Sequence, residues 1–190
     1  MTIKIKEDYF ENTVNKISEE VNKLKLLKPI FYKTAKLLNK TFVKNKVIFC
    51  GNGGSASDAS HAVAEFVGRY LKKGRKSLNA ISLNENNATI TALANDFDYK
   101  YVFSRQLEGV GKKGDVLFAI STSGKSKNII EVLKKAKSIG IKTVLLTGNN
   151  NIGKKFCDIC IKVPAKRVDR IQEFHIMILH LIAEYVDQRN

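Results

Sequence analysis

His61 and Glu65 are the residues whose types and spacing most clearly suggest chemistry. They stand four residues apart in the segment CGNGGSASDASHAVAEFVGRY, residues 50–70. On a helix, this spacing places an imidazole and a carboxylate on one face. Such a pair can bind a metal ion or work as acid and base. The pair is therefore a candidate site for metal binding or proton transfer.

A glycine-rich loop comes just before this pair. It contains Gly51, Gly53 and Gly54, and it follows a short apolar run that predicts a buried strand. We expect Ser57 and Asp58 to cap a helix that runs from Asp58 to about Tyr70. Backbone N–H groups at the start of such a helix can bind an anion. The segment therefore predicts a phosphate site beside the His–Glu pair.

A second polar loop, ISTSGKSK at residues 120–127, combines four hydroxyls with a strand-to-helix turn. The hydroxyls belong to Ser121, Thr122, Ser123 and Ser126. The turn lacks the first glycine of a nucleotide-binding P-loop, so its likeness to that motif is superficial. It is either a second phosphate-binding turn or an ordinary serine-rich connection, and the density of hydroxyls favours the first.

Apolar runs alternate with amphipathic segments along the chain, which predicts an α/β fold with a parallel sheet flanked by helices on both faces. We expect a single domain over residues 1–190. Strands are expected at 46–50, 78–83, 116–121, 142–147 and 157–163. Helices are expected at 7–27, from Pro29 through Leu38, and at 58–70, 89–94, 99–110, 126–139 and 169–188. Both polar loops then follow the carboxyl ends of strands, where such folds bind ligands.

The expected last helix carries Gln172, His175 and His180. Gln172 and His180 are eight residues apart, about 12 Å along the axis, so an ion shared by them would lie between two extended side chains. By spacing alone, His175 is the closer partner for Gln172. Helix geometry therefore leaves open which of these histidines would join His61 and Glu65.

The composition limits the partners of the chain. A net charge of +15 allows nucleic-acid binding, but the lysines are scattered and no basic stretch carries interleaved aromatic residues. We therefore expect a lysine-rich surface that attracts small anions, with no nucleic-acid partner. No apolar run is long enough to cross a membrane. The N-terminal residues do not resemble a signal peptide, so we expect a cytoplasmic protein.

The three cysteines do not suggest a disulfide framework. Cys157 and Cys160 form a CxxC pair, but no second pair completes a zinc site. The segment alternates like a strand, which predicts that the two thiols point to opposite faces of the sheet. We therefore interpret both as structural residues.

The patterns GNGGSxxDAxHxxxE, ISTSGxSxN and RIQExH together resemble the sugar isomerase (SIS) domain family. The chain is most similar to the bacterial phosphoheptose isomerases, over nearly its whole length including two N-terminal helices. That resemblance implies isomerisation of sedoheptulose 7-phosphate to D-glycero-D-manno-heptose 7-phosphate through an enediol, which would supply heptose for lipopolysaccharide or capsule. The STSG motif alone marks only the wider family.

The resemblance also assigns roles to residues. It implies one Zn²⁺ per subunit bound by His61, Glu65, Gln172 and His180, and so chooses His180 over His175. Glu65 and His180 match the expected acid–base pair, with Asp169 as an auxiliary catalytic residue. Metal binding lowers the basicity of a carboxylate, so whether Glu65 is ligand and base at once stays open.

Substrate-binding positions carry over in the same way. They are Asn52, Gly53, Gly54, Ser55, Glu65, Asn95, Asp96, Ser121, Thr122, Ser123, Ser126 and Gln172. By themselves, Asn95 and Asp96 also fit a turn that ends a helix, and Asp169 also fits a helix cap.

The resemblance further implies a homotetramer with active sites near subunit interfaces. The amphipathic N-terminal helices are consistent with such packing. The alternatives are an isomerase of another phosphosugar, because the phosphate loop does not encode sugar length, and a non-catalytic SIS protein that associates with a replication initiator. A scaffold of that kind has no reason to keep the full His61, Glu65, Gln172 and His180 set.

Overall fold

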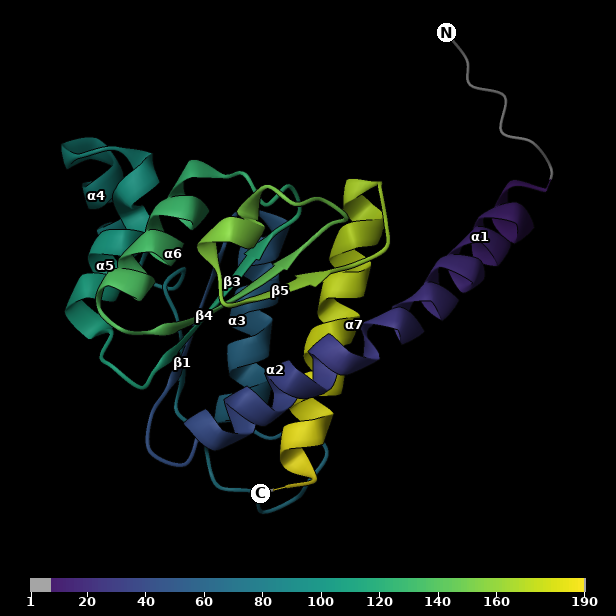
Figure 1. Ribbon diagram of the computed structural model, residues 1–190, viewed down its shortest axis with the longest axis horizontal. Helices are drawn as coiled ribbons and strands as arrows, with labels where there is room; N and C mark the ends of the chain where they lie inside the picture. Colours follow the sequence, from purple (N-terminus) through teal and green to yellow (C-terminus); the bar gives the residue numbers. More distant parts are fainter. Residues whose placement is uncertain (1–7, 190) are drawn as a thin grey trace, which may run out of the picture.

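The computed structural model describes residues 8–189 and contains a five-stranded parallel sheet (Figure 1). The strands are β1 (Val47–Gly51), β2 (Ala80–Ser82), β3 (Val116–Ser121), β4 (Lys142–Thr147) and β5 (Ile159–Lys162). Their order across the sheet is β2-β1-β3-β4-β5. The predicted α/β fold with a parallel sheet is confirmed.

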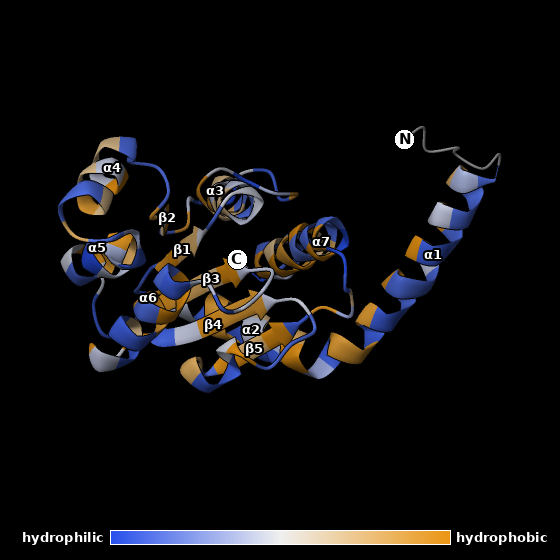
Figure 2. Ribbon diagram, turned by 90° about the horizontal axis from the view of Figure 1, so that it is seen from above, coloured by the Kyte–Doolittle hydropathy of each residue, from blue (hydrophilic) through white to orange (hydrophobic). Residues whose placement is uncertain are grey.

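Helices cover both faces of the sheet, as predicted. The α-helices are α1 (Tyr9–Lys23), α2 (Lys28–Thr41), α3 (Gly54–Val67), α4 (Asn87–Asp96), α5 (Val102–Val110), α6 (Lys127–Ser138) and α7 (Val168–Asp187). Short 3-10 helices are η1 (Leu24–Leu27), η2 (Tyr99–Tyr101) and η3 (Gly153–Phe156). The helices α3 and α7 pack on one face, and α5 and α6 pack on the other (Figure 2).

The central strands are apolar at consecutive positions because both of their faces are buried. Phe49 of β1 and Phe118 of β3 enter the core beneath α3 and α7. Ile48 and Leu117, their neighbours along the strands, enter the core beneath α5 and α6. Two hydrophobic cores therefore fix β1 and β3 from both sides. The loops that follow these two strands are held side by side as a result.

The helix α1 projects from the body of the molecule (Figures 1 and 2). None of its residues is buried, and its apolar side chains Phe10 and Val14 are 72% and 44% exposed. The predicted amphipathic helix is therefore present, but in a single chain only its end, at Val21, packs against the core. The continuous helix predicted for 7–27 is wrong at its end, because η1 replaces the α-helix after Lys23. Its first residue lies outside the described residues.

Other predicted bounds also need correction. The helix expected from Asp58 begins four residues earlier, at Gly54, and β2 is shorter than the strand expected at 78–83. The strand expected from Cys157 begins only at Ile159. In each case the apolar pattern identified the element, whereas backbone hydrogen bonds set its ends. Within residues 8–189, we find no helix with the length and apolar character needed to cross a membrane.

Candidate active site

The helices α3 and α7 lie side by side and run in the same direction, which brings distant parts of the sequence together. At the start of α3, Gly54 faces the amide of Gln172. Two turns later, His61 contacts His180. The α3 residues of these two contacts are seven positions apart, and the α7 residues are eight positions apart. The two spacings nearly agree, as expected for helices that run in the same direction with the same rise per residue.

His61, Glu65 and His180 form one cluster on this seam. The Nε2 atoms of His61 and His180 are 2.9 Å apart, and His61 Nε2 is 3.1 Å from Glu65 Oε1. Two Nε2 atoms 2.9 Å apart cannot both carry a proton. At least one of the two imidazoles therefore accepts a hydrogen bond at this nitrogen. Tyr70 stacks on His180, with ring centroids 5.6 Å apart, and limits how that ring can turn.

The geometry of this cluster fits a metal ion. One ligand atom from each of the three side chains lies within 4.8 Å of the others. Tetrahedral Zn²⁺ with bonds of about 2.0–2.1 Å needs neighbouring ligand atoms ~3.3 Å apart, so only small side-chain shifts would be required. Two imidazoles and a carboxylate also form a common ligand set of catalytic zinc sites, which leave a further position for water or substrate.

The structure separates the two histidines that helix spacing could not rank. His180 faces His61, whereas His175 is completely buried in the core beneath α7. Burial lowers the pKa of His175 to about 4, so this ring is neutral at pH 7. Gln172 lies against Gly54, about 10 Å along α3 from His61. The predicted metal-ligand role of Gln172 therefore stays a prediction.

A buried ion pair fastens the far ends of α3 and α7 to each other. The Arg75 guanidinium donates to the Asp187 carboxylate near the end of α7. It also donates to the carbonyl oxygens of Glu65 and Phe66 in the last turn of α3, at 2.7 and 2.9 Å. Arg75 therefore caps the helix that carries His61 and Glu65 and ties it to the helix that carries His180. Arg75 lies in a lysine-rich segment that matches no motif, so its role could not be predicted from the sequence.

The two polar loops meet at the carboxyl ends of β1 and β3, as predicted. The side chains of Asn52 and Asn128 exchange two hydrogen bonds, of 2.9 and 2.8 Å, between the first loop and the start of α6. The Tyr99 hydroxyl also donates to Asn52, at 3.1 Å. In the strand order of this sheet, connections diverge between β1 and β3, which is the usual ligand site of open α/β sheets.

The hydroxyls of the second loop surround the N-terminus of α6. Ser121 Oγ accepts from the Gly124 N–H at 3.1 Å and lies 3.4 Å from Ser126 Oγ. Ser126 is the residue before α6, yet its side chain makes no capping hydrogen bond. Thr122 and Ser123 are half-buried between these two serines. The turn therefore offers hydroxyls and the positive end of a helix to an anion.

Asp58 does not cap a helix as predicted, because it lies inside α3, one turn before His61. Its Oδ2 atom is buried without a hydrogen-bond partner among the described residues. Burial raises the pKa of Asp58 to about 6, partly offset by the nearby His61. Ser55, predicted to bind substrate, is buried in the first turn of α3.

Three further residues predicted for the site lie outside the cluster of His61, Glu65 and His180. Asn95 and Asp96 end α4, are exposed, and hydrogen-bond to each other at 2.9 Å. Asp169 lies in the first turn of α7 and pairs with Arg167, which holds the pKa of Asp169 below its usual value. The N-cap of α7 is Arg167, so interpreting Asp169 as the cap is wrong.

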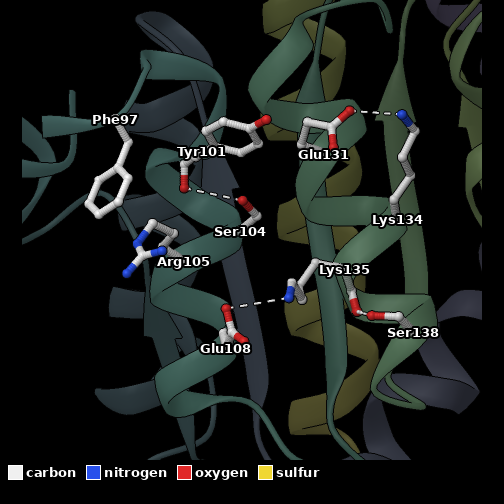
Figure 3. A pocket seen from close by; sticks show the side chains of 9 residues that line it. All are labelled: Phe97, Tyr101, Ser104, Arg105, Glu108, Glu131, Lys134, Lys135 and Ser138. Atoms are coloured by element: carbon white, nitrogen blue, oxygen red, sulfur yellow. Dashed lines mark hydrogen bonds and ion pairs between the residues drawn. The ribbon is translucent and has the colours of Figure 1, made fainter.

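A hollow of about 420 Å³ between α5 and α6 contains none of the predicted site residues (Figure 3). Its walls carry Arg105 over the Phe97 ring, and ion pairs that join Glu108 to Lys135 and Glu131 to Lys134. The charged groups there satisfy one another. This hollow therefore offers less chemistry than the seam between α3 and α7.

Comparison with known proteins agrees with this fold and site. The SIS domain family model matches residues 8–148. The phosphoheptose isomerase of Akkermansia muciniphila is 41% identical over 183 residues, covering 95% of this chain and 96% of that relative. The chain therefore belongs to the SIS-domain family and, within it, to the phosphoheptose isomerases, which are isomerase enzymes.

Solved structures support the same assignment. A phosphoheptose isomerase from Neisseria gonorrhoeae superimposes with a TM-score of 0.83 at 34% identity, covering 94% of this chain and 98% of that chain. One from Francisella tularensis gives a TM-score of 0.86 at 31% identity, covering 95% of both chains.

Arg75→Ala should strongly destabilise the protein, because it leaves the buried Asp187 charge unpaired. We expect a loss of about 3–5 kcal/mol in the free energy of unfolding at pH 7, measured by urea denaturation. The control is Lys134→Ala, which breaks an exposed pair in α6 and should change stability by less than about 1 kcal/mol. Equal effects of the two variants would contradict the role assigned to Arg75.

The same pair predicts an acid dependence. Burial would raise the pKa of Asp187, but the N–H groups of Lys72 and Leu71, together with Arg75, hold it below its usual value. The Asp187 carboxylate therefore makes its full contribution to stability above about pH 4. This contribution is lost as the pH falls through the pKa of Asp187 in the folded protein, which is lower than in the unfolded chain. Asp187→Asn should remove this part of the pH dependence of the free energy of unfolding. An unchanged acid profile would refute this interpretation.

Gly51→Ala should disturb the first loop, because a Cβ atom there would lie 2.3 Å from the Ser55 carbonyl oxygen. That neighbour is backbone, so the loop itself must move. We expect a loss of about 1–3 kcal/mol in the free energy of unfolding. Gly109→Ala is the matched control: its Cβ meets no atom within 4 Å, so helix propensity should leave it neutral or about 1 kcal/mol more stable.

Proposed function

We propose that this protein is a zinc-dependent phosphoheptose isomerase. It would convert sedoheptulose 7-phosphate to D-glycero-D-manno-heptose 7-phosphate by moving a proton between C1 and C2 through an enediol. The observation that carries the proposal is the contact of His61, Glu65 and His180 across the seam of α3 and α7. An aldose–ketose isomerase needs an acid–base pair of this kind at the sugar carbonyl.

Glu65 and His180 are the proposed acid–base pair. Glu65 lies on the seam beside His61, and we assign its carboxylate the transfer of the proton from one sugar carbon to the other. His180 would manage the hydroxyl protons, in an orientation restrained by the stacked Tyr70 ring. A zinc ion held by His61, Glu65 and His180, with Gln172 as proposed fourth ligand, would polarise the carbonyl.

The phosphate end of the substrate is assigned to the two loops. Ser121, Thr122, Ser123 and Ser126 would hold the phosphate at the N-terminus of α6, with Ser55 at the start of α3. Asn52, Gly53 and Gly54 would contact the sugar, and Gln172 lies against Gly54, where it can join them. Asn95, Asp96 and the auxiliary residue Asp169 complete the proposed set, and loop or subunit contacts would have to bring them to the sugar.

The exposed apolar face of α1 supports a homo-oligomer, which we propose to be a tetramer with active sites near its interfaces. The projecting helix gives each chain an unburied apolar stripe that a second copy can cover. We further propose a cytoplasmic enzyme whose product enters lipopolysaccharide or capsule precursors.

His180→Ala should lower kcat for sedoheptulose 7-phosphate isomerisation by about 10²–10⁴-fold, as expected for loss of a general acid–base group. Chelation of metal should abolish turnover, and zinc should restore it. Lys134→Ala, in α6, is the folded control and should keep full activity. Assays with pentose and hexose phosphates in parallel would test sugar length. Undiminished turnover after both His180→Ala and chelation would refute the proposed mechanism.

A further inference from the structure

Cys157 and Cys160 lie together at the open edge of the sheet, contrary to the prediction that their thiols point to opposite faces. Cys157 precedes β5, so strand alternation does not apply to it. Both side chains pack against the same core, beneath α5 and α6, and both line one surface hollow of about 410 Å³. The prediction that the two thiols point to opposite faces of the sheet is therefore wrong.

A bend at Asp158 brings the two thiols together. The Asp158 carboxylate accepts from the Thr143 N–H at 2.8 Å and from the Thr143 hydroxyl at 2.7 Å. The Asp158 N–H in turn donates to the Thr143 hydroxyl at 2.9 Å. These contacts hold the chain against the start of β4 at the residue between Cys157 and β5. The Cys157 thiol donates to the Lys154 carbonyl oxygen at 3.5 Å, and its side chain lies close enough to Cys160 for each thiol to shift the pKa of the other.

The surroundings make the two thiols unequal. The neighbouring Cys157 thiol, together with the positive charges of Lys162 and Lys154, lowers the pKa of Cys160. Cys160 and burial raise the pKa of Cys157. Both side chains are partly exposed, so reagents in water can reach them. One thiol in the pair is thus the stronger candidate for a nucleophile, and its neighbour is placed to resolve the product.

A closed zinc site does not explain this pair. Among residues 8–189, His61, Glu65 and His180 are the only group of at least three His, Cys, Asp or Glu side chains that could hold a metal ion. The cysteine pair therefore lacks the third and fourth ligands of a structural zinc site. Two adjacent, accessible thiols without such ligands are instead suited to thiol–disulfide chemistry.

We propose that Cys157 and Cys160 are a redox-active pair that forms a reversible intramolecular disulfide with a small-molecule disulfide as oxidant. The Cys160 thiolate attacks one sulfur of the oxidant, forming a mixed disulfide and releasing one thiolate. The Cys157 thiol, losing its proton to solvent, attacks the Cys160 sulfur and expels the second thiolate. The protein loses two electrons and two protons, and the oxidant is reduced to two thiols.

The pair lies away from the proposed catalytic cluster. Its hollow is also lined by Leu27 of η1 and Ile30 of α2, the elements from which α1 projects. This site is therefore independent of the proposed isomerase chemistry, and its test does not depend on turnover.

The test is thiol mapping of the full-length protein after treatment with oxidised glutathione. The protein is denatured, alkylated and analysed by intact-mass and peptide mass spectrometry. We expect two of the three thiols to become unreactive toward alkylation, with a Cys157–Cys160 cross-linked peptide that dithiothreitol opens. The internal control is Cys50, which is completely buried in β1 and whose pKa burial raises, so it should stay reduced.

Single variants separate the two roles. Cys157→Ser should trap glutathione on Cys160, whereas Cys160→Ser should react more slowly at Cys157. In Cys50→Ser, Cys157 and Cys160 should become unreactive toward alkylation, as they do in the unaltered chain. Three alkylated thiols after oxidation, or cross-links between chains in place of the internal disulfide, would overturn the proposal. Faster mixed-disulfide formation at Cys157 in Cys160→Ser than at Cys160 in Cys157→Ser would overturn the assignment of Cys160 as nucleophile.

Discussion

The parallel packing of α3 on α7 is the constraint on which the candidate site depends. The His61 and His180 rings come from residues more than a hundred positions apart, and they meet only if both helices keep their register. Contacts at Gly54 and Gln172 set one end of the seam, and Arg75 with Asp187 sets the other. The cluster of His61, Glu65 and His180 lies between these two contacts, so its geometry depends on how the two helices pack.

Arg75 links several parts of the structure through one side chain. Its guanidinium donates to the carbonyl oxygens of Glu65 and Phe66 in the last turn of α3, where carbonyl groups have no partner within the helix. The same group neutralises a buried carboxylate on α7. A fork of five donors can make these contacts at once, whereas a lysine at this position could not reach them all. The loop between α3 and β2 is therefore part of the framework that positions Glu65.

Most of the fold and part of the site could be predicted from the sequence. Apolar strands alternating with helices identified the parallel sheet, and the rule for ligand sites in such sheets placed both polar loops correctly. Helix spacing paired His61 with Glu65, but it could not choose between His175 and His180. Those two side chains point about 140° apart on α7, and which one faces α3 depends on tertiary packing. The contacts of Arg75 with α3 and α7 also depend on tertiary packing, as does the proximity of Cys157 and Cys160. A single sequence carries no local signal for such contacts.

The central claim is that the seam of α3 and α7 builds a metal site. The most direct measurement is anomalous diffraction at the zinc absorption edge from crystals of the full-length protein grown with zinc. The account predicts one strong anomalous peak per chain, within bonding distance of His61 Nε2, His180 Nε2 and a Glu65 oxygen. A seam without such a peak, or zinc bound instead at the cysteine pair, would contradict it.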